Sequence, residues 1–455
     1  MTDSSSNPQS LIHSRDHSSL TDLLAIAFGG TTAMWAVGYV GRLPPAIIPG
    51  WVLLPVMLLC LLIGGFISGR YTPKGIRGGM KIGLLSSLLN LLILGSLLGG
   101  KQSNQIVPSA LLWIPGTFLI GAGLGSVGAA LGSLIPDPRR DQIHWLAVFA
   151  KIAAVAVFFL LIVGGIVTGN GAGLAVVDWP NSFGYNMFLY PLSRMSGGIY
   201  YEHAHRLFGS LVGLTTLILA LRMQKEETRP WLRRLAWIAL VLVILQGILG
   251  GLRVTGRFTL SDSPQDTAPS ILLAIAHGIL GQVFFALMVS IAVFTTVKWQ
   301  NPGEVTRKPS AATDHALTPL VVVVLLAQLI LGATVRHVAG GLMIHISLAV
   351  LVATLAVTCG VRAWGLYETQ PLLQRFGLIL TAGTGTQICL GIGALIAREG
   401  TLRKTDPTAL RVLVTTAHQA CGALLLACAV AFMLWSFRLL SKTPPNLGLE
   451  KESES

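Results

Sequence analysis

Runs of about twenty apolar residues recur along almost the whole chain, and they limit its possible folds more than any other feature. A helix of about 20 residues rises about 30 Å, the thickness of a bilayer's hydrocarbon layer. Lipid cannot hydrogen-bond an open backbone, so such runs span as helices. The predicted spans are residues 21–40, 49–69, 82–100, 108–135, 147–168, 199–221, 235–253, 271–296, 316–336, 341–361, 376–397 and 411–436. We therefore expect an all-α polytopic membrane protein with about twelve transmembrane helices.

Composition and charge agree with this fold class. The chain is 53% hydrophobic and only 11% charged, against roughly 25% charged residues in soluble proteins. With the N-terminus placed in the cytoplasm, the cytoplasmic loops hold 21 of the 32 lysines and arginines, as the positive-inside rule expects. The net charge of +13 is then a topology signal. Basic residues scattered through short loops exclude a nucleic-acid surface.

The chain divides at the polar stretch 136–142. Before it lie an expected disordered cytoplasmic tail at residues 1–20 and four extra spans at residues 21–135. These four spans contain no histidine and many glycines, which favour close helix packing. Their role is open, and we expect residues 1–135 to be dispensable for the chemistry. A polar tail occupies residues 438–455.

The eight later spans repeat a two-helix pattern, which predicts two pseudo-repeated four-helix bundles at residues 147–296 and 316–437. Three odd spans carry Q-x-x-L-G, the first has a faded version, and every even span carries a histidine. The motifs are Gln246 to Gly250, Gln328 to Gly332 and Gln387 to Gly391, the faded one is Leu160 to Gly164, and the histidines are His205, His277, His345 and His418. A glycine follows three of the histidines at i+4: Gly209, Gly281 and Gly422.

A histidine inside a membrane span indicates a functional site, although a hydrogen bond across helices is the plainer alternative for any single one. These four lie at similar depth near the outer leaflet. Two neutral imidazoles on facing helices can ligate haem iron, and the following glycine leaves space for a flat macrocycle. A zinc or copper cage usually adds cysteines or carboxylates, and only Glu202 lies nearby. We therefore predict two haem sites.

One span begins Y-Y-E-H-A-H-R. Glu202 shares a helix face with His205, and Arg206 is in position to pair with Glu202. His203 lies about 200° around the helix from His205, so only one of these two can face the bundle. A purely structural Glu–Arg pair is the alternative interpretation. The glycine-rich segment from Gly164 to Pro180 follows a spanning helix, which favours a lid over an outward-facing pocket.

At these residues the chain resembles haem A synthase, the membrane enzyme of cytochrome oxidase assembly that oxidises a methyl group of haem O to the formyl group of haem A. The resemblance covers roughly residues 147–437. Its motifs are the G-L-x(4)-W-P loop (Gly173, Leu174, Trp179, Pro180) with Asp178, the E-x-x-H-R of Glu202, His205 and Arg206, the A-H of His277, the R-H-x-x-G-G-L of Arg336 to Leu342, and the T-x-A-H-Q that contains His418.

The resemblance implies an oxidoreductase that takes oxygen from water and removes electrons. Substrate haem O would bind at His205, His277 and Arg206, and Glu202 would be catalytic. A haem b cofactor would bind through His345 and His418, so that all four histidines ligate haem iron. The implied partners are haem O synthase, an electron donor or acceptor, and the lipid bilayer. The implied location is the inner (cytoplasmic) membrane, with both haem sites towards its outer face.

Two departures from the family pattern leave alternatives open. Ile346 stands where an arginine usually follows the third histidine, so His337 is a rival ligand to His345. No cysteine pair occurs at residues 169–198, and the five cysteines fall inside apolar spans, where they fit small buried side chains. A non-catalytic di-haem cytochrome that exchanges electrons with quinol explains the histidines equally well. A twelve-helix transporter would instead place its site near the midplane.

Overall fold

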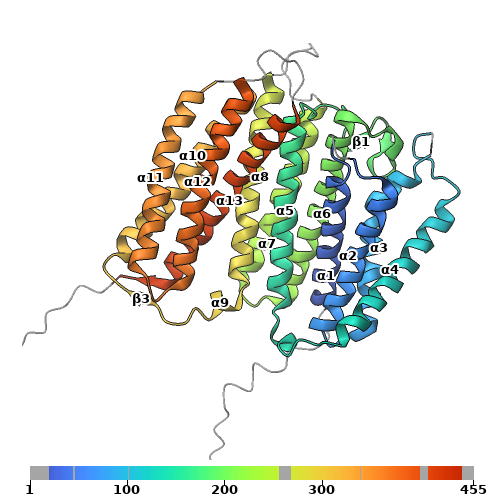
Figure 1. Ribbon diagram of the computed structural model, residues 1–455, viewed down its shortest axis with the longest axis horizontal. Helices are drawn as coiled ribbons and strands as arrows, with labels where there is room; N and C mark the ends of the chain where they lie inside the picture. Colours follow the sequence, from blue (N-terminus) through green and yellow to red (C-terminus); the bar gives the residue numbers. More distant parts are fainter. Residues whose placement is uncertain are drawn as a thin grey trace, which may run out of the picture.

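The computed structural model describes residues 20–44, 47–100, 102–255, 268–338, 340–399 and 408–442. Within these ranges twelve helices are long and apolar enough to cross a membrane, which confirms the predicted fold class of a multi-pass all-α membrane protein (Figure 1). They are α1 (Thr21–Val40), α2 (Gly50–Tyr71), α3 (Gly75–Leu98), α4 (Ala110–Ser133), α5 (Trp145–Gly169), α6 (Gly197–Glu226), α7 (Pro230–Val254), α8 (Ala268–Phe294), α10 (Ala311–Val338), α11 (Leu342–Leu366), α12 (Pro371–Glu399) and α13 (Ala409–Leu439). Most residues of the two expected tails lie outside the described part.

The remaining elements are short and lie in the connections. They are η2 (Arg140–Gln142), β1 (Asn181–Ser182), β2 (Tyr185–Asn186), η3 (Met187–Leu189), η4 (Leu192–Arg194), α9 (Val297–Gln300), β3 (Thr306–Arg307) and β4 (Leu440–Ser441). β1 and β2 form an antiparallel hairpin within the α5–α6 connection, whereas β3 pairs in parallel with β4. α1 starts and α13 finishes at one end of the molecule, which we call the terminal end (Figure 1). We call the opposite end the lid end, because it carries residues 170–196, the lid.

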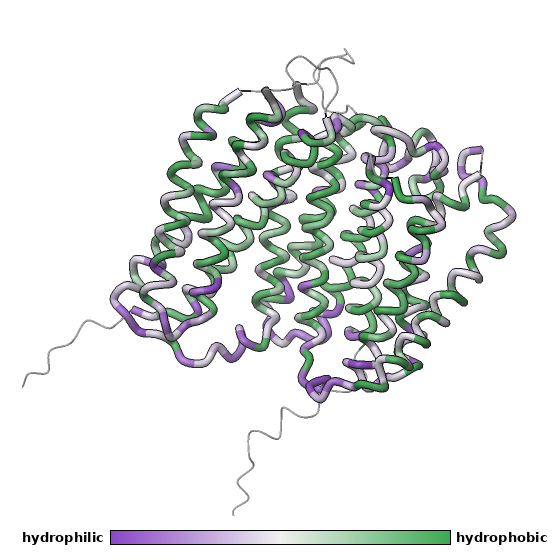
Figure 2. The backbone as a smooth tube through the Cα atoms, viewed as in Figure 1, coloured by the Kyte–Doolittle hydropathy of each residue, from purple (hydrophilic) through white to green (hydrophobic). Residues whose placement is uncertain are grey.

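The transmembrane part is apolar between two polar rims. Figure 2 shows hydrophobic residues along the middle of the helices and hydrophilic residues concentrated at both ends. Large apolar side chains also point outwards, among them Leu111 at 82% exposure and Trp364 at 70%. In water such a surface would be unfavourable, whereas lipid chains solvate it.

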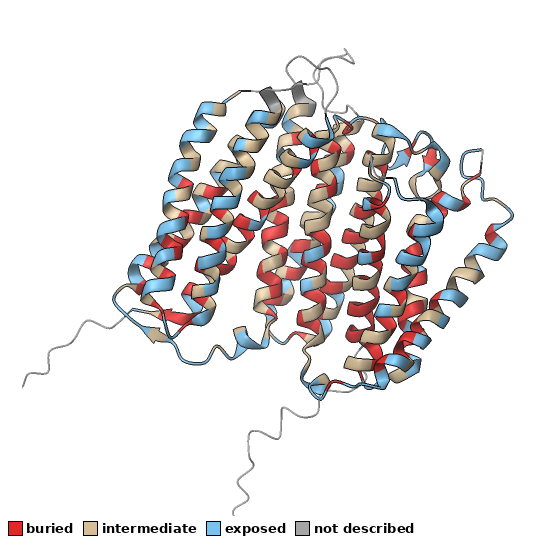
Figure 3. Cartoon of the chain, in the orientation of Figure 1, coloured by how far each residue is buried: buried red, intermediate tan, exposed pale blue. Residues whose placement is uncertain are grey.

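Two clusters of buried side chains form the core. The first is built mainly from α1 and α5–α8, and the second from α10–α13. α8 and α13 contribute side chains to both clusters, and α13 packs against both α5 and α8. Figure 3 shows the buried residues concentrated along the helices in the middle of the molecule. The two helix groups therefore share a packed seam along α13.

α2, α3 and α4 pack tightly through glycine, as the sequence predicted for the first group of spans. A Cβ atom on Gly65 of α2 or on Gly79 of α3 would collide with the carbonyl oxygen of Gly125 in α4. The absence of side chains lets the three backbones approach one another closely. α1 packs against α2 and α3 on one side and against α5 on the other, and so joins these helices to the rest of the molecule.

Candidate functional site

The four repeat histidines form two pairs with almost the same geometry. The ring centroids of His205 on α6 and His277 on α8 are 6.3 Å apart, with an interplanar angle of 81°. Those of His345 on α11 and His418 on α13 are 6.4 Å apart at 79°. A metal bonded to two imidazoles at about 2 Å from each nitrogen separates the ring centroids by roughly 6 Å. Both pairs thus have the spacing of two imidazoles that share one metal atom.

Each histidine ring packs against a glycine of the preceding helix. A Cβ atom on Gly250 would lie 3.3 Å from Cε1 of His277, and one on Gly332 would lie 3.2 Å from Cε1 of His345. Gly391 stands in the same relation to His418 at 3.1 Å, and so does Gly164 to His205, also at 3.1 Å. The glycine that ends each Q-x-x-L-G motif therefore provides the space for a histidine ring. The faded first motif keeps this glycine.

The motif glutamines hold the helices that carry the histidines. Nε2 of Gln246 donates to the backbone oxygen of His277 at 3.0 Å, and Nε2 of Gln328 donates to that of His345 at 3.0 Å. Gln387 contacts the ring of His418, with 3.4 Å between the two Nε2 atoms.

The glycines that follow the histidines have two different roles. A Cβ atom on Gly281 would lie 3.0 Å from Nε2 of Gln246, and one on Gly422 would lie 3.3 Å from Nε2 of Gln387. Only Gly209 borders open space. That these glycines leave room for a macrocycle stays a prediction, and Gly281 and Gly422 also accommodate a motif glutamine.

The donor set fits haem better than a free metal ion. Nδ1 of His205, His277, His345 and His418 is buried, and no hydrogen-bond partner for it occurs among the described residues. Within the same part of the chain, no group of three or more His, Cys, Asp or Glu side chains could hold a metal ion. A zinc or copper cage needs such a group, whereas haem iron takes four ligands from the porphyrin and needs only two from the protein.

The two other candidate histidines lie elsewhere. His203 is fully buried, its Nδ1 lies 3.1 Å from Oγ of Ser182, and its ring packs against Tyr190 of the lid. Helix geometry predicted that only one of the two can face the bundle, and in the structure this one is His205. His337 lines a cavity between the two helix groups, while His345 faces His418. The structure therefore favours His345 over its rival as a ligand.

Glu202 and Arg206 form a buried ion pair on α6, with 3.2 Å between Arg206 Nε and Glu202 Oε1. Arg206 also donates to three lid carbonyls: those of Asp178 at 2.7 Å, Asn181 at 2.9 Å and Val176 at 2.7 Å. The structural ion pair considered above is thus present, and it belongs to a wider clamp. Arg206 fixes the lid beside the first histidine pair and orients Glu202.

The lid packs against the end of α7. The indole ring of Trp179 lies over Gly251, and the guanidinium of Arg253 lies against Gly173, where a Cβ atom would be 2.6 Å from Nη2. These contacts give a structural role to Gly173 and Trp179 of the G-L-x(4)-W-P motif. The Asp178 carboxylate accepts hydrogen bonds from the backbone N–H groups of Phe183, at 2.7 Å, and Gly184, at 2.8 Å.

Sequence reasoning missed a second set of lid contacts, made by the α3–α4 connection. Oγ of Ser103 donates to the Gly184 oxygen at 2.7 Å, and the Asn186 N–H donates to Oδ1 of Asn104 at 2.7 Å. Gly95 of α3 packs directly on the Phe188 carbonyl. Burial raises the pKa of Tyr190, so the phenol that packs on His203 stays neutral. The extra N-terminal helices therefore support the lid.

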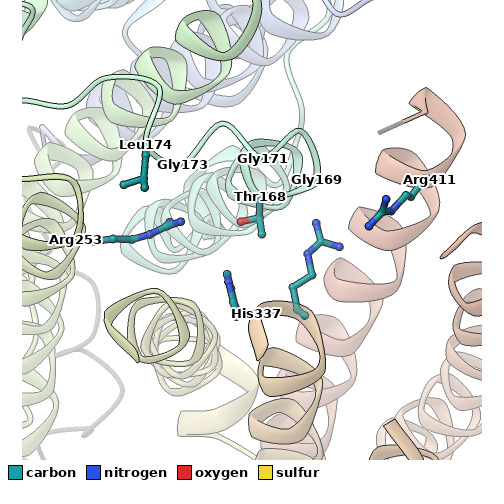
Figure 4. Close-up of a pocket in the computed structure, with 9 residues that line it drawn as sticks. Thr168, Gly169, Gly171, Gly173, Leu174, Arg253, His337 and Arg411 are labelled. Carbon is teal, nitrogen blue, oxygen red and sulfur yellow. The ribbon is translucent and has the colours of Figure 1, made fainter. Parts of the chain in front are cut away.

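A cavity of about 300 Å³ opens between the two helix groups at the lid end. It is lined by Thr168, Gly169, Gly171, Gly173, Leu174, Arg253, Arg336, His337 and Arg411. Figure 4 shows Arg253 and Arg411 on opposite sides, with Thr168 and His337 between them. The sequence did not predict that these arginines would lie close together, because they belong to three separate helices.

Part of the chain is similar to a known protein family. Residues 183–345 match the COX15-CtaA family of cytochrome oxidase assembly proteins. The COX15-CtaA match includes Glu202, His205, Arg206, His277 and His345, and it confirms the resemblance predicted from the motifs over these residues. It supports a role in cytochrome oxidase assembly. The first half of the lid and His418 lie outside the matched residues, and no curated protein matches the chain.

Proposed function

We propose that the protein is a haem A synthase that oxidises a methyl group of haem O to the formyl group of haem A. One observation carries this proposal: the two histidine pairs have equal geometry, but among the described residues the Glu202–Arg206 ion pair and its clamp on the lid come from α6, the helix of His205. This asymmetry is what one substrate site and one redox site require. His205 and His277 would hold haem O, and His345 and His418 would hold haem b.

The residues of the chain have distinct tasks in this reaction. Haem ligated by His345 and His418 supplies one-electron redox chemistry. The Glu202 carboxylate can stabilise positive charge on the methyl carbon or accept a proton from the attacking water. Arg206 pairs with this carboxylate and orients it, and its bonds to the lid carbonyls close the site. Conversion of methyl to formyl adds an oxygen atom from water and releases protons and electrons, so an electron acceptor is a required partner.

The positive-inside bias supports an orientation in the membrane. Because the basic residues are concentrated in the loops of the terminal end, we place this end in the cytoplasm and the lid end at the outer face of the inner membrane. Haem O synthase in the same bilayer would supply the substrate.

The equal geometry of the two pairs also favours a second candidate, a di-haem cytochrome that passes electrons to or from quinol. Analysis of haems extracted from protein expressed with a supply of haem O separates the two. A synthase should contain haem A or a hydroxylated precursor and show a six-coordinate, low-spin b-type spectrum. Only unmodified haem in a fully loaded protein would leave the cytochrome as the function.

A further inference from the structure

The cavity between the helix groups concentrates positive charge next to both histidine pairs. Arg253 comes from α7, Arg336 from α10 and Arg411 from α13, so both groups contribute to one space. His337 adds an imidazole to the same lining. The described lining residues include no carboxylate. Guanidinium groups at this depth are costly without counter-charges.

Helix register relates the cavity to the two sites. Arg253 follows Gly250, which touches His277, by three residues, and Arg336 follows Gly332, which touches His345, by four. One helical turn rises about 5 Å, so each arginine lies about one turn nearer the lid end than its histidine. Arg411 precedes His418 on α13 by seven residues, or about two turns.

Two arginines of this cavity, Arg253 and Arg336, differ from the clamp residue Arg206. The guanidinium of Arg206 donates hydrogen bonds to Glu202 and to the lid carbonyls. Arg253 and Arg336, in contrast, make no ion pair or side-chain hydrogen bond with any residue that the structure describes. A guanidinium presents paired donors that match a carboxylate. A ligand that brings carboxylates would therefore satisfy this cavity.

We propose that the cavity is a shared carboxylate-binding site for the macrocycles of the two histidine pairs. Arg253 pairs with a carboxylate of the ligand on His205 and His277, while Arg336 and Arg411 pair with one of the ligand on His345 and His418. This inference rests on the proposed function, because haem supplies the carboxylates. Both ligands thereby lie near the same positive charges. Removal of one arginine charge from the cavity therefore lowers the reduction potentials at both sites.

Haem and its dimethyl ester, which lacks the carboxylates, test the proposal by titration into the purified full-length protein. The wild type should bind haem more tightly than the ester. Arg336→Gln should weaken haem binding roughly tenfold, the effect of one lost charge-assisted hydrogen bond, and leave ester binding unchanged. Arg438→Gln, on the same helix as Arg411 but at the terminal end, should change neither affinity. Retained ester binding also shows that a variant is folded.

A second arm assigns each arginine to its ligand. In a His205→Ala background, where only the second pair remains, Arg336→Gln should still weaken haem binding, whereas Arg253→Gln should have less than a twofold effect. Equal affinities for haem and ester in the wild type would overturn this inference and leave the proposed function standing. Phospholipid that copurifies with the wild type and is lost from the arginine variants, without any ester effect, would also overturn it in favour of a headgroup site. No haem binding by the wild type would overturn both proposals.

Discussion

At the scale of single residues, each paired histidine depends on a glycine of the preceding helix. All four rings occupy the space left by a glycine on the preceding helix, with 3.1–3.3 Å to a Cβ atom built there. An added methyl group would have to move either the ring or the helix. Overpacking of this kind costs about 1–3 kcal/mol.

We expect Gly391→Ala to reduce haem at the second pair, because the new Cβ atom would displace the His418 ring from its position opposite His345. Haem content per protein and the width of the Soret band measure the effect. Gly385→Ala on the same helix borders open space and is the matched control. Equal haem loss in both variants would show that the effect comes from helix destabilisation instead.

His345→Ala should abolish haem binding at the second pair, and His337→Ala should preserve most of it. Only the ring of His345 faces His418, whereas His337 lines the cavity between the helix groups. Low-spin absorbance of the purified variants measures this difference. Haem loss in His337→Ala with retention in His345→Ala would reverse the assignment.

Glu202→Ala should keep both haem sites occupied while haem A formation falls at least a hundredfold, within the usual contribution of a general acid or base. Ligation depends on the histidines, so binding and catalysis are separable. Mass spectrometry of extracted haems should detect accumulated haem O. Glu202→Gln should also lose haem A formation if the reaction needs the negative charge of the carboxylate. Unchanged haem A in Glu202→Ala would remove this residue from the mechanism.

At the scale of elements, the lid is held from two sides. Arg206 of α6 binds its carbonyls from one side, and the α3–α4 connection binds its hairpin from the other. That residues 1–135 are dispensable for the chemistry stays a prediction. The contacts of the α3–α4 connection with the lid restrict this prediction to the second site. We now expect the N-terminal helices to matter for closure of the first site and not for ligation at the second.

The double variant Ser103→Ala, Asn104→Ala should loosen the lid, because it removes two hydrogen bonds worth about 1 kcal/mol each. Hydrogen exchange at residues 181–190 should then be roughly tenfold faster or more, while haem content at the second pair stays constant. Ser133→Ala is the control, since its hydroxyl bonds only within α4, to the Ala129 oxygen. Unchanged exchange would show that α6 and α7 hold the lid alone.

At the scale of the whole molecule, two helix groups of similar design share the seam along α13. α13 carries His418 of the second pair and packs against α5, the helix that supports His205 through Gly164. The cavity with the three arginines lies at the lid end of this interface. The arrangement gives each group its own histidine pair and one shared polar space.

The sequence by itself determined the spans, the hairpin repeat and the four histidines of the repeat, but it left His337 as a rival ligand to His345. Hydropathy over about twenty residues and the spacing of Q-x-x-L-G and His are local properties, and lipid enforces helices on them. Helix geometry also showed that only one of His203 and His205 can face the bundle, and the tertiary structure identified it as His205.

Only the tertiary structure decided which surfaces meet. The motif glycines support histidines of the next helix, and two of the glycines after the histidines accommodate glutamines instead of bordering open space. Arg206 binds backbone carbonyls of the lid, and a carbonyl acceptor has no signature in a sequence because every residue carries one. Arg253, Arg336 and Arg411 come together from three separate helices. Helix packing sets such contacts through the fit of side chains over long sequence separations, which no local pattern encodes.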